Sequence, residues 1–273
     1  MTSSMGAVLS GDGTGIAYES RGSGPALVIV LGALADRHAA SLQRLVDLLA
    51  EEFTVYTYDR RGRGESGDTQ PYAVEREIED IEALIDAAGG RASLYGHSSG
   101  GALALLAAAA LGSRVRGLAV YDIPYTDDPQ GRAAWKEYIS RLTGLLADGK
   151  KGDAVALFLR ITGLSEEQVA GMHGAPFWPA MEAAGHTLAY DHTAILGPEA
   201  AIPTDAAAGV TVPSLVLNGG ASFPFMRASA ERLSTVIPHA RLLILEGEAH
   251  DVRPEAIAPV LAEFFRGSSG APG

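Results

Sequence analysis

The chain of 273 residues contains no cysteine, so it can form neither a disulfide framework nor a metal site with thiolate ligands. Thiol redox chemistry is excluded for the same reason. A chain without disulfides suits the reducing cytoplasm, which is the location we expect. No second histidine is spaced to form a zinc site with His250, whose neighbour Glu248 also lies in a predicted loop. We therefore expect neither a metal ion nor a cofactor.

Basic residues are also scarce, since 21 lysines and arginines stand against 33 aspartates and glutamates and form no basic run. The net charge of −12 disfavours nucleic acid as a partner. The most apolar stretch, residues 102–111, is too short to cross a bilayer, and the N-terminus does not resemble a signal peptide. We expect a soluble protein that acts on a small molecule, has no membrane partner, and has an oligomeric state that the sequence leaves open.

Short apolar runs alternate with helical patterns along most of the chain, which predicts βα units and a mostly parallel sheet flanked by helices. Two stretches before them, 7–9 and 15–19, are predicted to form an antiparallel hairpin, which brings the sheet to eight strands. The predicted strands of the alternating part are 26–31, 53–58, 92–95, 115–121, 212–218 and 241–245.

One segment breaks this alternation. Residues 124–209 contain no convincing strand and several helical stretches that are interrupted by prolines. We interpret this segment as a helical lid, or cap, inserted into a single α/β core that comprises residues 1–123 and 210–267. Residues 268–273, which are rich in glycine and serine, are predicted to form a disordered tail.

Residues 96–100 read Gly-His-Ser-Ser-Gly, a G-x-S-x-G sequence between an apolar strand and a helix rich in small residues. Gly96 and Gly100 leave room for the chain to turn abruptly from the strand into the helix. Such a turn, a nucleophile elbow, holds Ser98 in a strained conformation and aims its hydroxyl away from the sheet. The pattern predicts a catalytic serine, and its alternative is a tight turn that happens to contain serine.

A serine hydroxyl needs an adjacent base, and the base needs a carboxylate that orients it and offsets its charge. Among the seven histidines, His250 follows a late strand and precedes the final helix. This position lies at the carboxyl edge of the sheet, where the ligands of such folds bind, so His250 is the predicted base. His97, next to Ser98, is expected to have a structural role.

These motifs and their order resemble those of the α/β-hydrolase fold. The matching features are the elbow around Ser98, the sequence DRRGRGES at residues 59–66, the late His250 and the helical insertion. The resemblance covers nearly all of residues 8–266 and implies that fold. Members that resemble this chain are mostly esterases, lipases, lactonases or amide hydrolases, with lyases, cofactor-free oxygenases and cyclases among the exceptions.

The chain departs from the family pattern at the catalytic acid. Family members usually carry Gly-x-x-Asp after the strand that is 212–218 here, whereas this chain has Ser222 in place of the aspartate. Some members take the acid from the neighbouring strand end, where Asp122 follows the strand 115–121, so Asp122 is the predicted acid. The alternatives are a turn-capping Asp122, an acid supplied by Asp191, or a serine–histidine dyad.

The resemblance also places the donors of an oxyanion hole. Ala33 follows Gly32 after the strand 26–31, and Ser99 follows the nucleophile. Both would donate their backbone N–H groups, so the identity of their side chains matters little.

The loop after the strand 53–58 contains G-x-G-x-x-G at residues 62–67, a sequence typical of dinucleotide-binding sites. No helix opens directly after it and the strand before it is not the first of the series, so we reject a dinucleotide. Arginines 60, 61 and 63 are instead expected to brace loops through hydrogen bonds and ion pairs, with Asp59 as one partner.

The leading hypothesis is a serine hydrolase that cleaves an ester, lactone, thioester or activated amide through an acyl-serine intermediate. Apolar and aromatic residues of the predicted lid are expected to pack against the core, and those that face Ser98 would favour a small, moderately hydrophobic substrate. The predicted substrate-binding residues are Leu34, Trp135, Trp178, Tyr190, Phe223 and Met226. Two alternatives stay open, a non-hydrolytic cyclase or lyase of a biosynthetic intermediate and a ligand-binding protein with little turnover.

Overall fold

A central sheet organises the computed structural model, which describes residues 3–269. Its strands are β1 (Ser3–Leu9), β2 (Gly15–Gly22), β3 (Ala26–Val30), β4 (Thr54–Tyr58), β5 (Ala92–His97), β6 (Val115–Tyr121), β7 (Ser214–Gly219) and β8 (Arg241–Leu245). Within the described residues they form one eight-stranded sheet in the order β1-β2-β4-β3-β5-β6-β7-β8. β2 is antiparallel to β1 and to β4. The other six strands, β3 to β8, are parallel to their neighbours among them.

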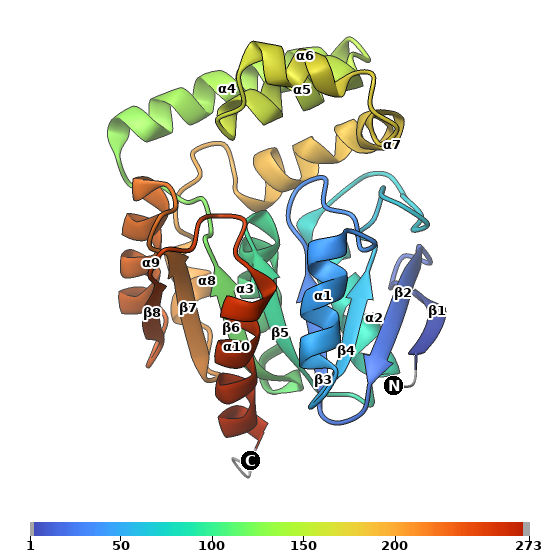
Figure 1. Cartoon of the computed structure of the whole chain (residues 1–273), viewed down its shortest axis with the longest axis vertical. Helices are drawn as coiled ribbons and strands as arrows, with labels where there is room; N and C mark the ends of the chain where they lie inside the picture. Colours follow the sequence, from blue (N-terminus) through green and yellow to red (C-terminus); the bar gives the residue numbers. More distant parts are fainter. Residues whose placement is uncertain (1–2, 270–273) are drawn as a thin grey trace.

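Helices cover both faces of this sheet because its central strands are apolar on both sides (Figure 1). In β3, Leu27 and Ile29 point to one face and Val28 and Val30 to the other, and all four are buried. The first face packs against α1 (Ala40–Leu49) and α10 (Pro254–Ser269), and the second against α2 (Val74–Ala87), α3 (Ser99–Leu111) and α9 (Pro224–Val236). The predicted eight-stranded α/β architecture is confirmed.

The predicted strands are all present, with differences at their ends. β5 continues two residues further than predicted, to His97, so that it runs directly into the elbow. β7 begins at Ser214 because Pro213 has no N–H to donate to the sheet. β1 and β2 are longer than predicted, since β1 is an almost fully exposed edge strand whose sequence carries no alternating apolar pattern.

A layer of helices lies over the carboxyl ends of the parallel strands, at the top of Figure 1. This helical layer consists of α4 (Pro129–Ala147), α5 (Lys151–Ile161), α6 (Glu166–Met172) and α7 (Trp178–Ala183). It has an apolar core of its own, which includes Leu142, Val155 and Leu188. No helix in residues 3–269 is both long enough and apolar enough to span a membrane.

The chain returns to the body of the molecule before the predicted end of the lid at residue 209. It passes through the π-helical turn η3 (Tyr190–Ile195) and the short helix α8 (Thr204–Ala208). Leu196, Ile202 and Ala207 are buried in the core on the α3 side of the sheet. The residues around α8 therefore pack with the body rather than with the helical layer.

Helix α10 continues through Ser269, two residues into the segment that was predicted to form a disordered tail. Ile257, Leu261 and Phe265 are spaced four residues apart on one face of α10 and are buried against the sheet. This apolar face stabilises the helix into the glycine- and serine-rich sequence. Residues 270–273 lie outside the described part of the chain.

Helix α3 packs close to the sheet because two glycines face neighbouring backbone. A Cβ added to Gly100 would lie 2.3 Å from the carbonyl oxygen of Val30, and one added to Gly96 would lie 2.5 Å from the carbonyl oxygen of Gly100. Both distances are far shorter than van der Waals contact, so no larger residue fits without moving the backbone. The two glycines fix how the elbow sits on β3.

We expect Gly100→Ala to lower the free energy of unfolding by about 3 kcal/mol, because backbone atoms block the added methyl group. Gly144→Ala is the matched control, since Gly144 lies in helix α4 and its added Cβ would meet nothing within 4 Å. This control should raise the free energy of unfolding by about 0.5–1 kcal/mol. Urea denaturation measures both, and equal effects of the two substitutions would contradict the close approach.

His192 is buried among aromatic side chains of α4 and α5. The centroid of its ring lies 5.3 Å from that of Trp135, 5.5 Å from that of Tyr138 and 5.1 Å from that of Phe158. The Tyr138 hydroxyl lies 2.7 Å from Nδ1 of His192. Burial lowers the pKa of His192 to about 4, although the carboxylate of Asp191 opposes the shift. The imidazole is therefore neutral at pH 7.

In the unfolded chain a histidine takes up its proton near pH 6.5, whereas folded His192 does so only near pH 4. The unfolded state thus binds more protons between these values, and the protein loses stability as the pH falls through this window. From pH 7 to pH 4 we expect the wild type to lose up to about 3 kcal/mol more of its unfolding free energy than His192→Asn. Denaturation at both pH values measures the difference, and parallel losses would contradict this role of His192.

Candidate functional site

The chain turns sharply between strand β5 and helix α3, with Ser98 at the tip. Ser98 has φ 57° and ψ −129°, a conformation that a residue other than glycine adopts only under strain. Its amide donates a hydrogen bond to the carbonyl of Tyr121 (2.9 Å), the last residue of β6. The elbow is thereby tied to the end of the next strand, and Ser98 stays partly exposed at the edge of the sheet.

Asp122 follows β6 directly, and its buried carboxylate has four hydrogen-bond partners. Oδ1 accepts from Nδ2 of Asn218 (2.6 Å) and from the amide of Gly219 (3.1 Å). Oδ2 accepts from the Ser222 hydroxyl (2.6 Å) and lies 3.3 Å from Nδ1 of His250. Burial by itself raises the pKa of Asp122, but the hydrogen bonds from these donors outweigh it and hold the pKa below its ordinary value. Asp122 is therefore an anion at neutral pH.

Ser222 stands where the family pattern has an aspartate, and its hydroxyl contacts the carboxylate that lies one strand away. It donates to Asp122 and also lies 3.7 Å from the sulfur of Met226. The missing acid at residue 222 is visible in the sequence, whereas the contacts of Ser222 and Asn218 with Asp122 were not predicted. The polar residues that follow the two strands were the signal that could have predicted these contacts, since adjacent parallel strands such as β6 and β7 end at one edge of the sheet.

The loop between β8 and α10 presents His250 to this carboxylate. The Tyr121 hydroxyl donates to the carbonyl of Ala249 (2.5 Å), which fixes the loop just before the histidine. The ring of His250 packs edge-on against that of His97, with centroids 4.9 Å apart, and its centroid lies 6.4 Å from that of Phe223. About a quarter of the His250 side chain (26%) is exposed, so the imidazole is not sealed in the interior.

Ser98 and His250 lie at the same rim, although no hydrogen bond joins their side chains in the described part of the chain. Ser98 is tied to Tyr121, whose neighbour Asp122 contacts His250, and His97 packs on the His250 ring. Catalytic hydrogen bonds are often long in free enzymes, so this placement is compatible with a nucleophile and its base. Burial, together with His250, lowers the pKa of His97 to about 3, so His97 is neutral at pH 7.

The turn after β3 lies against the elbow. A Cβ added to Gly32 would lie 3.2 Å from Cβ of Ser98 and 3.6 Å from Oγ of Ser99, so the two segments are in close contact. Among the described residues, the backbone N–H groups of Ala33 and Ser99 have no hydrogen-bond acceptor. Two unpaired donors that flank a serine could together hold a developing oxyanion.

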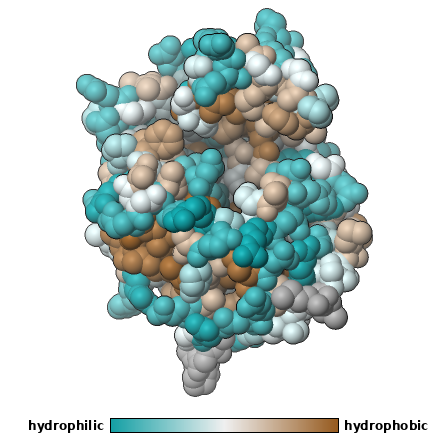
Figure 2. Space-filling view, viewed as in Figure 1, coloured by the Kyte–Doolittle hydropathy of each residue, from teal (hydrophilic) through white to brown (hydrophobic). Residues whose placement is uncertain are grey.

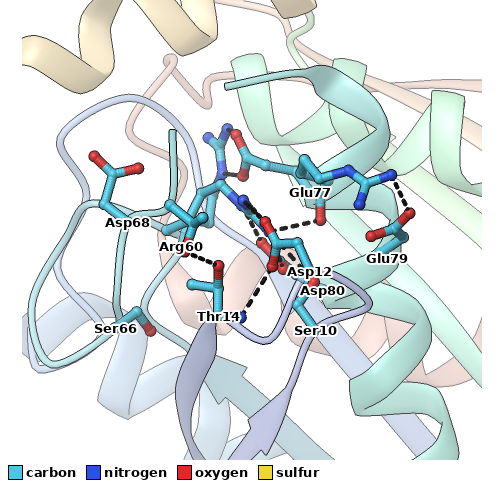
Figure 3. A network of polar contacts seen from close by, with 12 residues as sticks. Ser10, Asp12, Thr14, Arg60, Ser66, Asp68, Glu77, Glu79 and Asp80 are labelled. Carbon is cyan, nitrogen blue, oxygen red and sulfur yellow. Dashed lines mark hydrogen bonds and ion pairs between the residues drawn. The ribbon is translucent and has the colours of Figure 1, made fainter. Parts of the chain in front are cut away.

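Arg61 braces the loop after β4, as predicted. It pairs with Asp80 of α2 and with Asp12 in the turn between β1 and β2, and Figure 3 shows these carboxylates side by side. No three His, Asp or Glu residues within residues 3–269 are arranged to hold a metal ion. The expected pairing of the loop arginines with Asp59 was wrong, because Asp59 accepts from Nη1 of Arg37 (2.7 Å) instead.

Asp191, which the sequence offered as an alternative acid, has other partners. Its Oδ1 accepts from Nη1 of Arg60 (2.6 Å) and from the Ser99 hydroxyl (2.8 Å). Its Oδ2 accepts from Nη2 of Arg63. The carboxylate that contacts His250 is that of Asp122, and Asp191 instead meets the segment directly after the nucleophile.

Three of the predicted substrate-binding residues lie near the elbow or the histidine. Leu34 follows Ala33 and packs against the core of the helical layer. Phe223 stands beside His250, and Met226 lies under the Ser222 hydroxyl. In the space-filling view, apolar residues are visible between the helical layer and the body of the molecule (Figure 2).

The other three predicted substrate-binding residues belong to the helical segment, where two have contacts within it and Tyr190 contacts the loop after β4. Trp135 donates from its indole to the carbonyl of Gly197 (2.9 Å) and packs against His192. Trp178 is buried inside the helical layer. The hydroxyl of Tyr190 bonds to Asp68 and its ring stacks on another tyrosine, which pins it to the loop after β4.

Comparison with known proteins identifies the family. A family model described as the alpha/beta hydrolase family matches residues 27–260. An alpha/beta hydrolase from Sphaerobacter thermophilus DSM 20745 is 50% identical, and its structure superposes with a TM-score of 0.83 over 95% of this chain and 100% of that one. A malate-bound thermophilic esterase from Thermogutta terrifontis is 22% identical, with a TM-score of 0.72 over 97% of this chain and 99% of that one, and this likeness concerns the fold alone.

A curated relative, the uncharacterized hydrolase YraK of Bacillus subtilis (strain 168), is 35% identical over 97 residues. The match covers 34% of this chain and 35% of the relative, so it spans about a third of that protein's length. The family match, the Sphaerobacter structure and YraK support hydrolase activity in general. Since the family model covers most of its length, the chain belongs to the alpha/beta hydrolase family.

Proposed function

We propose that the protein is a serine hydrolase in which Ser98 is the nucleophile, His250 the base and Asp122 the acid. The hydrogen bond between His250 and Asp122 beside the strained elbow is the observation that carries this proposal. Residue 222 is a serine, so the source of a carboxylate for His250 was open. The contact with Asp122 supports that residue as the source. The non-hydrolytic alternatives rested on that gap, so nothing specific now favours them.

In the proposed reaction, Nε2 of His250 takes the proton of the Ser98 hydroxyl while the serine oxygen attacks the substrate carbonyl. The carbonyl oxygen becomes an oxyanion that the N–H groups of Ala33 and Ser99 stabilise. His250 then gives its proton to the leaving alcohol or amine, and an acyl-serine remains. Water, activated by the same histidine, releases the acid and restores Ser98.

We infer a small, moderately hydrophobic ester, lactone, thioester or activated amide as substrate, with the helical layer as a lid over the site. Leu34, Phe223 and Met226 lie near the elbow or the histidine and offer apolar contacts to the acyl or leaving group. Trp135 and His192 form the aromatic part of the segment that we assign to the lid. We therefore expect the enzyme to select its substrate by the size of an uncharged group and not by recognition of a phosphate group.

Ser98→Ala is expected to lower kcat for p-nitrophenyl butyrate by about 10⁴-fold or more, because no other group takes over the attack. A fluorophosphonate probe should label the wild type at one site and leave the variant unlabelled. Ser41→Ala, on the exposed side of α1, is the control and should retain both rate and labelling. Turnover of the ester at the wild-type rate by Ser98→Ala would refute the proposal.

Asp122→Asn is expected to lower kcat by about 10²- to 10⁴-fold, because the imidazole loses the anion that orients it and offsets its charge. Adding Ser222→Asp to this variant should restore part of the rate, since the Ser222 hydroxyl oxygen lies 2.6 Å from Oδ2 of Asp122 and an aspartate there would bring a carboxylate close to the lost one. Steady-state kinetics of the single and double variants tests this, with circular dichroism as the folding control. An unchanged rate in Asp122→Asn would point to a serine–histidine dyad.

A further inference from the structure

We propose that Asp191 is a positioning residue that holds both donors of the oxyanion hole in place through Ser99 and Arg63. The inference rests on the proposed function and adds a residue of the helical segment to its machinery. Asp191 lies in η3, outside the loops that carry the proposed nucleophile, base and acid. Its carboxylate is fully buried and is shared by three donors that reach the two sides of the elbow.

The first connection runs through Ser99. The Ser99 hydroxyl donates to Oδ1 of Asp191 (2.8 Å), and its backbone N–H is one of the two proposed oxyanion donors. Ser99 is only 1% exposed, so water does not replace this hydrogen bond. Because the hydroxyl and the N–H belong to one residue, fixing the side chain restrains the first turn of α3 and the direction of its amide.

The second connection runs through Arg63 to the turn after β3. Nη2 of Arg63 donates to Oδ2 of Asp191, and Nη1 donates to the carbonyl of Gly32 (2.8 Å). Nε of Arg63 donates to the Thr187 hydroxyl (3.1 Å), so the helical segment holds the guanidinium at two points. The guanidinium therefore cannot rotate without breaking several hydrogen bonds.

The carbonyl of Gly32 and the N–H of Ala33 belong to the same peptide unit. A trans peptide is planar, with its C=O and N–H pointing in opposite directions, so a donor that fixes the carbonyl also fixes the N–H. A cation on the carbonyl also polarises the unit and makes the N–H a better donor. Arg63 thus sets both the direction and the strength of the Ala33 donor.

Charge balance explains why the residue is an aspartate. Arg60 and Arg63 bring two positive charges into the interior, and Asp191 and Glu77 bring two negative ones. Arg60 also donates to the carbonyl of Leu31 (3.2 Å), next to Gly32. Burial opposes ionisation of Asp191, but the two guanidinium groups lower its pKa well below the ordinary value, so it is charged at neutral pH. A neutral side chain would leave one buried arginine without a counter-charge.

The test compares Ser99→Ala and Asp191→Asn with Asp80→Asn in the chain of 273 residues. Asp80 pairs with Arg61 at equal burial and on the same loop, but its network reaches α2 and the β1–β2 turn instead of the elbow. We measure kcat and KM for p-nitrophenyl butyrate, the inhibition constant of phenylboronic acid and the melting temperature. The boronic acid forms a tetrahedral adduct with a serine and so reports on the oxyanion hole.

We expect kcat to fall about 10-fold in Ser99→Ala and about 100-fold in Asp191→Asn, with KM within about twofold of the wild type. The affinity for phenylboronic acid should fall in step with kcat in both variants. Asp80→Asn should lower the melting temperature and leave kcat and the inhibition constant unchanged. A role of Asp191 in stability alone would not produce this separation of kcat from KM.

The inference is overturned if Ser99→Ala and Asp191→Asn keep the wild-type kcat, or if their losses match those of Asp80→Asn. If Asp191→Asn does not fold, Ser99→Ala decides the question, because it removes a single hydroxyl. Failure of the proposed function gives a different result, in which Ser98→Ala retains turnover and no serine is labelled. An active, labelled Ser98 together with an unaffected Ser99→Ala would reject this inference and leave the serine hydrolase intact.

Discussion

A buried negative charge at the end of β6 must be matched by donors, and the arrangement of the candidate site follows from this requirement. Asp122 is shielded from water, so its carboxylate depends on hydrogen bonds for stability. The donors come from the end of β7, the turn after it and the loop after β8. Parallel neighbours end at one edge of the sheet, which is why three separate segments can reach the same carboxylate.

The same geometry supports Asp122 as the proposed acid, one strand away from the position at which the family pattern has an aspartate. β6 and β7 are adjacent, and Ser222 and Asp122 are within hydrogen-bond distance across their ends. Across these strand ends, the Asp122 carboxylate contacts both the Ser222 hydroxyl and Nδ1 of His250. Ser222 carries no charge, and its hydroxyl instead donates a hydrogen bond to the charged carboxylate of Asp122. The buried polar groups at these strand ends are thus paired with one another.

Backbone groups provide the other half of the site, and glycines make their close placement possible. Gly100 lets α3 approach the end of β3, and Gly32 lets the turn after β3 contact the elbow around Ser98. The buried ion pairs of Arg60 and Arg63 then fix the carbonyls beside these segments. Buried ion pairs contribute little net stability, but their geometry is specific, and this specificity suits a site whose donors must be aimed.

The sequence alone determined the class of fold, the order of the strands along the chain, the elbow at Ser98 and the position of His250 at the sheet edge. These features depend on local patterns, because apolar runs, glycine spacing and chain order are visible without coordinates. Local patterns failed in two places. β1 carries no apolar alternation, and the arginine that pairs with Asp59 is the distant Arg37 rather than one of the arginines of its own loop. The partners of Asp122 and of Asp191 were decided only by the tertiary structure, since hydrogen bonds between residues about 100 positions apart depend on which strand ends and helices the fold brings together.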